Sequence, residues 1–172
     1  MLLGLAPAAH GGNRTGRIFT GDRSGDFLFA ALWRAGLCNQ PDSHARSDGL
    51  AMRGAYLCAA VRCAPPANKP LPAERDRCLP YLLHELALLP RARVVVALGA
   101  FAWDAALRVL PGAGEARPRP RFGHGAMARV GLYTLIGSYH PSQQNTFTKR
   151  LTPAMLDDVL RRAERLAREL AA

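Results

Sequence analysis

The chain has 172 residues, 49% of them hydrophobic, and carries a net charge of +10. It is long enough to bury a core, and it has no apolar run near the ~18 residues of a membrane span, so we expect one globular domain and no membrane partner. The excess of basic residues, almost all arginine, favours a polyanionic partner such as nucleic acid. The alternative is a general bias towards arginine, with the surplus spread over solvated surfaces.

Hydrophobic periodicity and the positions of Gly and Pro divide the chain into alternating strands and helices. In chain order we expect strand 1–5, helix 26–35, strand 55–61, helix 72–89, strand 93–98, helix 101–110, an irregular segment 111–128, strand 132–137, and a last helix with Thr152 as N-cap and Pro153 as its first residue. This alternation predicts an α/β domain in which helices flank a mostly parallel sheet in three layers.

Three loops that follow predicted strands carry unusual residues. The first is glycine-rich, with six glycines from Gly4 to Gly25; the second, 62–70, contains three prolines; the third begins at His140. In parallel sheets, ligands bind outside the carboxyl ends of the strands, where these loops lie. The first loop alone reads equally well as a long surface loop that happens to be glycine-rich, but the coincidence of the three loops favours a binding site.

Motifs in these loops resemble those of the type 5 uracil-DNA glycosylases, the iron–sulfur members of the uracil-DNA glycosylase superfamily. The matching segments are Gly-Leu-Ala-Pro-Ala at 4–8, Phe-Thr-Gly-Asp at 19–22, Arg-Cys-Ala-Pro-Pro at 62–66 with Asn-Lys-Pro at 68–70, and Ser-Tyr-His-Pro-Ser-Gln-Gln-Asn-Thr at 138–146. They occur in the family's order over nearly the whole chain.

The resemblance implies a uracil-DNA glycosylase-like domain with a four-stranded, mostly parallel sheet. It also implies hydrolytic removal of uracil and other deaminated bases from damaged DNA, as the first step of base excision repair. We further expect a monomer in the cytoplasm, associated with the nucleoid of a prokaryote.

Such an enzyme must flip its target base out of the duplex, and the resemblance assigns three catalytic residues to the pocket that receives it. Asp22 is expected to orient the attacking water or stabilise the developing cationic sugar, although it also suits a helix N-cap. His140 is expected to donate a hydrogen bond to a carbonyl oxygen of the departing base. Asn68 is expected to contact the base or the water.

Four further residues are expected to bind the base. Phe19 is placed to stack on the flipped ring, with an ordinary core phenylalanine as the alternative. Gly4 lies near the end of the first predicted strand, and Ala6 follows that strand. Ala59 stands where the related type 4 enzymes carry an asparagine that reads uracil. Because alanine cannot make those hydrogen bonds, we expect a broad range of bases that includes hypoxanthine.

The loop after His140 is expected to press into the DNA, and Arg150 to contact a phosphate. The predicted DNA-binding residues of this loop are Pro141, Ser142, Gln143, Gln144 and Asn145. Lys149 stands where the family usually has glycine, so a left-handed conformation there would be strained. His10 and His124 are possible pocket residues, with structural roles slightly preferred for both.

Cys63 and Cys78 match two of the four ligands that hold a [4Fe–4S] cluster in this family. The other two normally form a Cys-x-x-Cys pair before the first strand. Either residues 1–172 are a single domain truncated at its N-terminus, or they are a degenerate domain with an incomplete cluster site; we expect the truncation, because the downstream motifs are all intact. Cys58 is expected to be buried as a small core residue.

Two other functions remain open. A catalytically impaired relative that binds DNA damage would keep the basic charge and Phe19, but would not need Asp22 and His140 together. A nucleotide-binding enzyme of Rossmann type is disfavoured, because the glycines of the first loop lack the Gly-x-Gly-x-x-Gly spacing.

Overall fold

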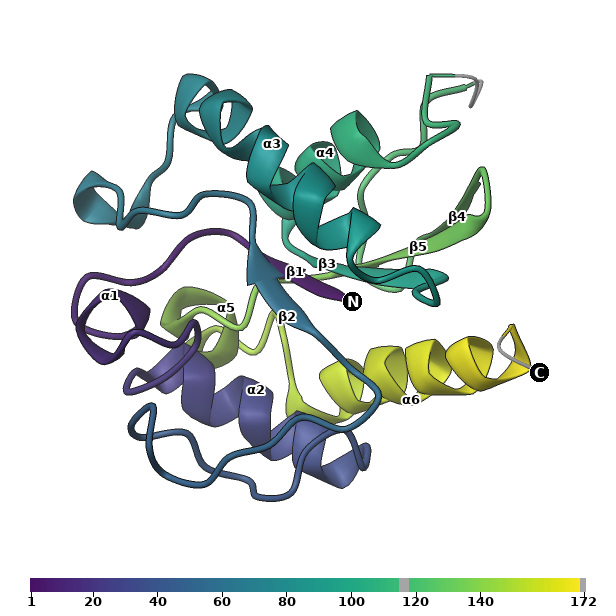
Figure 1. The fold of residues 1–172 in the computed structure, drawn as a ribbon. Helices are drawn as coiled ribbons and strands as arrows, with labels where there is room; N and C mark the ends of the chain where they lie inside the picture. The colour runs from purple at the N-terminus through teal and green to yellow at the C-terminus, as the bar shows by residue number, and fades with distance from the viewer. Residues whose placement is uncertain (115–117, 171–172) are drawn as a thin grey trace.

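A computed structural model describes residues 1–114 and 118–170 of the chain. Its centre is a single five-stranded sheet in the order β2-β1-β3-β5-β4 (Figure 1). The first four strands in this order are parallel, and β4 runs antiparallel to β5. The strands are β1 (Leu2–Gly4), β2 (Leu57–Ala59), β3 (Val94–Leu98), β4 (Met127–Val130) and β5 (Tyr133–Ser138). The α-helices are α1 (Gly12–Thr15), α2 (Arg23–Arg34), α3 (Pro72–Ala87), α4 (Ala100–Val109), α5 (Gln143–Phe147) and α6 (Pro153–Glu169).

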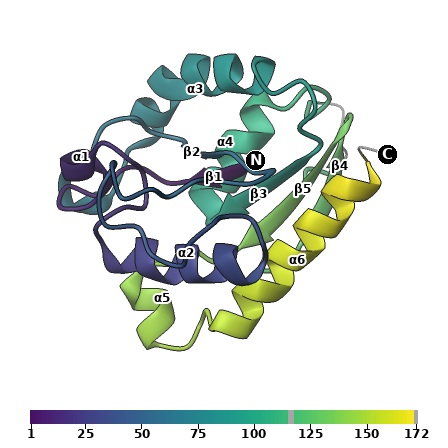
Figure 2. The same cartoon turned by 60° about the horizontal axis from the view of Figure 1, so that its bottom comes forward.

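Helices cover both faces of the sheet, which confirms the predicted three-layer α/β domain. Helices α2 and α6 lie on one face, and α3 and α4 on the other (Figures 1 and 2). Strand β3 contributes Val94, Val96 and Leu98 to the first face and Val95 and Ala97 to the second. A strand buried on both sides reads as a continuous apolar run, and for this reason β3 was predictable from the sequence.

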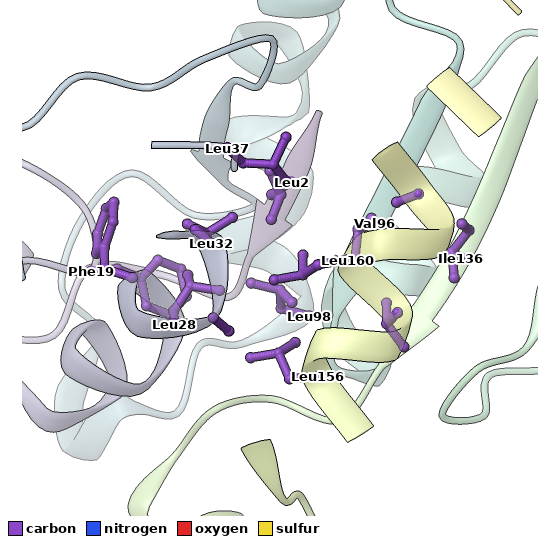
Figure 3. Close-up of a cluster of buried hydrophobic side chains, with 14 of the residues drawn as sticks. Leu2, Phe19, Leu28, Leu32, Leu37, Val96, Leu98, Ile136, Leu156 and Leu160 are labelled. Atoms are coloured by element: carbon purple, nitrogen blue, oxygen red, sulfur yellow. The ribbon is translucent and has the colours of Figure 1, made fainter. Parts of the chain in front are cut away.

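The core between the sheet and helices α2 and α6 is built mainly from leucines and valines, together with two phenylalanines, Phe19 and Phe29. Figure 3 shows Leu156 and Leu160 of α6 directed towards Val96 and Leu98 of the sheet, with α2 alongside. Leu156 and Leu160 are completely buried. The spacing of four places both on one side of α6, as the apolar stripe of the sequence predicts.

The expected four-stranded sheet is wrong by one strand. Residues 127–130 form β4, which joins β5 through a hairpin with Gly131 and Leu132 at its turn; the first two of them were expected to be irregular and the other two were given no structure. Gly131 has φ +55°, a conformation that two-residue hairpin turns favour. Only Val130 of this short edge strand is buried, so the sequence carries no apolar run that marks it.

Helix α2 begins three residues before the expected start. Asp22 is its N-cap, with an extended backbone and a side chain that accepts a hydrogen bond from the amide of Gly25 at 2.9 Å. The apolar periodicity starts only at Phe27, after a polar first turn, which explains the late prediction. At α6 the predicted start is confirmed, because Thr152 caps the helix and Pro153 is its first residue.

Several elements are shorter than expected, such as β2, and the structure adds helices at the carboxyl ends of the parallel strands. Two short helices that the sequence analysis did not predict, α1 and α5, shape the first and third loops there (Figure 2). Cys58 is buried in β2, as predicted. None of the helices in the described parts of the chain is long and apolar enough to cross a membrane.

Candidate active site

A pocket of about 570 Å³ opens at the carboxyl ends of the parallel strands, and all three of the predicted loops contribute to it. We call it the main pocket. The predicted site residues that line it are Ala6, Phe19, Asp22, Asn68, His140, Ser142, Gln143 and Gln144. Lining residues that the sequence analysis did not single out are Leu5, Pro7, Ala8, Arg23, Ser24, Pro65, Ala67 and Lys69.

The position of the main pocket follows from the topology of the sheet. Strand β1 has β2 on one side and β3 on the other, and the chain leaves β1 and β3 towards opposite faces, through α2 and α4 respectively. Such a reversal opens a crevice at the strand ends of an α/β sheet. Three loops distant in sequence therefore meet at one place.

Asp22 has two structural relationships at the start of α2. One carboxylate oxygen, Oδ1, caps the helix through the amide of Gly25, and the side chain also lines the main pocket. A Cβ atom on Gly11 would overlap the second oxygen, Oδ2, so this glycine is required for the carboxylate to occupy its place. The N-cap alternative is therefore correct, and it fixes the carboxylate at the pocket wall.

Phe19 is at once a core residue and a wall of the main pocket. Its side chain is 6% exposed and belongs to the cluster beneath α2, while its ring centroid lies 5.8 Å from that of His140. Its backbone has φ +54°, which is costly for a residue with a side chain. Gly4 does not line the pocket but supports the ring, because a Cβ atom there would come within 2.6 Å of Phe19 Cε2.

His140 follows β5 and lines the pocket, with its ring beside that of Phe19. Burial lowers the pKa of His140 to about 4, so its imidazole is neutral at neutral pH. The side-chain amide of Asn145 donates a hydrogen bond to the His140 carbonyl oxygen at 2.9 Å. Asn145 therefore holds the loop that presents His140 and does not itself line the pocket.

Asn68 lies in a single 3₁₀ turn, Pro66–Asn68, in the second loop. Both Ala67 and Asn68 have positive φ angles, 51° and 55°, and asparagine is one of the residues that tolerate this conformation best. The exposed Asn68 side chain faces the main pocket from the loop of β2, together with Lys69.

Three other predicted residues lie outside the main pocket. Ala59 is buried at the end of β2, paired in register with Gly4, and lines a second pocket of about 360 Å³. Pro141 is buried behind the loop of His140. Arg150 places its guanidinium carbon 4.6 Å from the centre of the Tyr139 ring, a cation–π contact beside the pocket loops.

Neither of the two undecided histidines lines the main pocket. His10 is exposed, and its backbone carbonyl accepts a hydrogen bond from Arg14. His124 Nδ1 accepts a hydrogen bond from the amide of Tyr139 at 3.2 Å, and burial lowers the pKa of His124. The structural roles preferred for these residues fit their positions.

Two basic residues that line the main pocket were missed, as was an aromatic residue that contacts one of them. Arg23 and Lys69 line it, and the guanidinium carbon of Arg23 lies 6.0 Å from the ring of Phe147, which is 67% exposed on α5. Arg23 follows Asp22 directly, so a correct helix start would have placed it at the pocket. Phe147 is an aromatic residue within a polar segment that leads to Lys149 and Arg150, which is a pattern typical of nucleic-acid contacts.

Cys63 is exposed in the second loop and Cys78 is half-buried on α3. Within residues 1–114 and 118–170, no group of three or more His, Cys, Asp or Glu side chains is arranged to hold a metal ion. The described residues therefore do not provide the four-ligand set of a [4Fe–4S] cluster by themselves. The assignment of Cys63 and Cys78 as two of its ligands stays a prediction.

Comparison with known proteins identifies the family of this chain. A model of the uracil DNA glycosylase superfamily matches residues 1–164. A type-5 uracil-DNA glycosylase of Mycobacterium bovis is 57% identical over 169 residues, which are 97% of this chain and 62% of that protein. The type-5 uracil-DNA glycosylase of Thermus thermophilus is 51% identical over 168 residues, 97% of this chain and 75% of its own length. That of Pyrobaculum aerophilum is 50% identical over 163 residues, 95% and 70% respectively.

The chain spans less than two thirds of the length of the Mycobacterium bovis relative. The matches nevertheless cover both the sheet and all three pocket loops, since they extend over nearly all of this chain. The chain therefore belongs to the uracil DNA glycosylase superfamily, and within it to the type-5 family.

Proposed function

We propose that this protein hydrolyses the N-glycosidic bond between uracil and deoxyribose in DNA and thereby acts in DNA repair. One observation carries the proposal: Phe19, Asp22, Asn68 and His140, from three separate loops, all line one pocket. A volume of about 570 Å³ lies within the range of pockets that hold small ligands. The names of the type-5 relatives point to the same reaction.

A base inside a duplex is inaccessible, so the target nucleotide must be rotated out of the stack and into the main pocket. Phe19 offers the face of its ring for stacking. Because its backbone and ring are both held in place by glycine-lined contacts, the ring is ordered before the base arrives. A rigid stacking surface costs little entropy on binding.

Asp22 is the carboxylate of the reaction. As the bond to the base breaks, positive charge develops on the sugar, and a carboxylate at the pocket wall stabilises that charge or orients the attacking water. The hydrogen bond from the Gly25 amide to Oδ1 fixes the group, while Oδ2 is not needed for the cap. The N-cap therefore gives the carboxylate a fixed position.

His140 acts on the leaving base. At neutral pH its imidazole is uncharged, since burial lowers its pKa to about 4. A neutral imidazole can donate one hydrogen bond to a carbonyl oxygen of the base, and that bond strengthens as negative charge builds on the oxygen. His140 thus contributes a hydrogen bond and no net positive charge. Asn68 faces the same space and supplies an amide for the base or the water.

Charged and polar groups around the mouth of the pocket suit the DNA backbone. Arg23 and Lys69 line the pocket, Arg150 lies beside it, and Gln143 and Gln144 of α5 border the space that the flipped nucleotide enters. We propose that the basic residues contact phosphates and that α5 contacts the duplex at the vacated position. We further propose that the protein acts as a monomer on the nucleoid DNA of the cytoplasm.

We also propose that hypoxanthine and other deaminated bases are substrates. At the position of Ala59, β2 offers no side chain that could form hydrogen bonds with uracil, because Ala59 is buried and its methyl group has no hydrogen-bonding capacity. Without such paired hydrogen bonds, a pocket loses the contacts that would select uracil over other bases that fit into it.

The test is base release from duplex oligonucleotides that contain uracil, hypoxanthine or neither, with the unmodified chain and the Asp22→Asn variant. Asparagine also caps helices, so this change removes the charge and leaves the start of α2 in place. We expect release of both bases and a fall of roughly 10²–10⁴-fold in the variant. Asp26→Asn, in the same helical turn but exposed and outside the pocket, is the matched control and should retain full activity.

Failure to release either base, or equal rates in the two aspartate variants, would contradict the proposal. Tight binding to damaged duplex without release would instead favour a non-catalytic damage-binding protein. Release of uracil but not of hypoxanthine would leave the main proposal intact and overturn the broad specificity.

A further inference from the structure

We propose that Arg17 and Asp48 are positioning residues whose ion pair holds the loop that presents Phe19 and Asp22. Neither residue lines the main pocket. Residues 43–50, which we call the strap, contain no helix or strand and pack behind this loop. The effect on base release rests on the function proposed above, whereas the effect on the loop does not.

The Arg17 guanidinium joins the loop to the strap. Its Nη2 atom lies 2.6 Å from Asp48 Oδ2 and donates to Ser43 Oγ at 3.0 Å. Its Nε atom donates to Thr20 Oγ1 at 2.9 Å. The side chains of Arg17 and Asp48 are only 21% and 13% exposed, so the pair is shielded from most of the solvent.

Asp48 in turn organises the strap. Its carboxylate accepts hydrogen bonds from the backbone amides of His44 at 2.8 Å, Ala45 at 3.2 Å and Leu50 at 3.0 Å. The Arg17 guanidinium and these amides hold the pKa of Asp48 well below its usual range. Asp48 is therefore a charged carboxylate whose hydrogen bonds hold the strap in its conformation and join it to the loop that contains Arg17.

The contact between strap and loop falls on the two residues between Phe19 and Asp22. Thr20 and Ser43 are completely buried, with their hydroxyl oxygens 2.6 Å apart. The amide of Gly21 donates to the Ser43 carbonyl oxygen at 2.9 Å. The loop is thus tied to the strap immediately beside both pocket residues.

This attachment explains how Phe19 keeps its unfavourable backbone. A φ of +54° costs a residue with a Cβ atom about 1 kcal/mol or more, and such strain persists only where the surroundings impose it. Release of the strap would allow Phe19 to relax to an ordinary extended conformation. Its ring would then leave its place against Gly4 and His140, and the stacking surface would be lost.

The chain offers a matched ion pair for comparison. Arg34 donates two hydrogen bonds to Asp157, both at 2.8 Å, and this pair joins α2 to α6 away from the pocket. Asp157 is 11% exposed, close to the 13% of Asp48. Loss of either carboxylate leaves a shielded arginine without its partner, so Asp48→Asn and Asp157→Asn should cost similar stability.

The experiment compares the two variants by amide hydrogen exchange and by single-turnover base release at saturating duplex. We expect Asp48→Asn to accelerate exchange of the amides in residues 17–25 and to lower the release rate by about 10- to 100-fold, with little change in duplex affinity. Asp157→Asn should accelerate exchange in α2 and α6 only and retain the release rate. A rate loss without an affinity loss separates positioning from general destabilisation.

Thr20→Val and Thr20→Ser test the same link if Asp48→Asn does not fold. Valine removes the hydroxyl that joins Arg17 to Ser43, whereas serine keeps it, so we expect the defect in the first variant and its rescue in the second. Unchanged exchange in residues 17–25, or equal rate losses in the Asp48 and Asp157 variants, would overturn the proposal. If the unmodified chain releases no base, the proposed function fails, and hydrogen exchange still decides whether the strap holds the loop.

Discussion

Left-handed backbone occurs in two regions of this molecule and is carried there by different residues. In the turns that connect helices and strands away from the main pocket it falls on glycines, such as Gly36 after α2 and Gly131 in the β4–β5 hairpin. In the pocket loops it also falls on residues with side chains. Within the described parts of the chain these are Phe19, Ala67, Asn68 and Lys149.

The glycine turns belong to a scaffold without backbone strain, whereas the pocket loops contain strained residues. A glycine turn costs no steric energy, whereas each of the other residues costs of order 1 kcal/mol or more. Three of the four line the main pocket, and the fourth, Lys149, follows α5, which also lines it. The core strands and helices supply the stability against which this strain is held, and the strain fixes the shape of the pocket.

The largest expected effect on the strained site comes from moving the Phe19 ring. In Gly4→Ala the new methyl group would meet Phe19 Cε2 at 2.6 Å, so the ring must shift from its place in the wall of the main pocket. We expect a loss of base release of about 100-fold, the scale of a displacement near 1 Å, with a stability cost of about 1–3 kcal/mol. Gly123→Ala, whose methyl group makes only an ordinary contact, is the control and should retain the rate. Equal rates in the two variants would show that Phe19 does not shape the site.

Burial of His140 makes the stability of the folded protein depend on pH, because the pKa of this residue differs between the folded and the unfolded chain. Its pKa is about 4 in the folded protein and about 6.5 in the unfolded chain, so the unfolded chain binds the proton first as the pH falls. Stability from this group is therefore complete above pH ~6.5 and is lost between pH ~6.5 and ~4, by at most about 3 kcal/mol.

Nuclear magnetic resonance titration of the imidazole, with His140→Gln to assign the signal, measures this directly. We expect a midpoint near pH 4 and no contribution of His140 to the rate profile between pH 5 and 8. A midpoint near 6.5 would mean that the ring is solvated and charged over part of that range.

The smallest expected effects are changes in stability when a glycine replaces a strained residue near the pocket, or when a residue with a side chain replaces a glycine in the scaffold. Lys149→Gly removes the strain at φ +57° and should stabilise the protein by up to about 1 kcal/mol. Gly36→Ala introduces strain at φ +73°, where a methyl group meets no other atom, and should destabilise it by about 1 kcal/mol. Thermal unfolding of both variants measures the pair, and a loss of stability in Lys149→Gly would contradict the assignment of strain.

The relaxed region was largely predictable from the sequence, and the strained region only in part. Apolar runs and periodicities located β3 and α6, because burial on a helix face or within a sheet repeats along the chain. Strand β4 was not predicted, because a short, exposed edge strand has no such repeat. The pocket residues Phe19 and His140 were found from motifs of the family resemblance; His140 follows β5 closely, whereas Phe19 lies well beyond the end of β1.

What the sequence could not show is how distant segments meet. Arg17 and Asp48 pair across 31 residues of chain, and neither belongs to a helix or strand whose periodicity would place it. Arg23 was missed because the start of α2 depends on a cap at Asp22, not on apolar spacing. Ala59 was assigned to the base pocket from the resemblance alone, and the structure places it at the second pocket.

The most direct test of the account is a crystal structure of the chain bound to a duplex that contains 2′-fluoro-deoxyuridine, whose glycosidic bond resists hydrolysis. We predict that the uracil is flipped into the main pocket and stacked on Phe19, with His140 at a base carbonyl oxygen and Asp22 beside the sugar. A uracil that stays in the duplex or occupies any other pocket would contradict the claim that this strained pocket is the site of base removal.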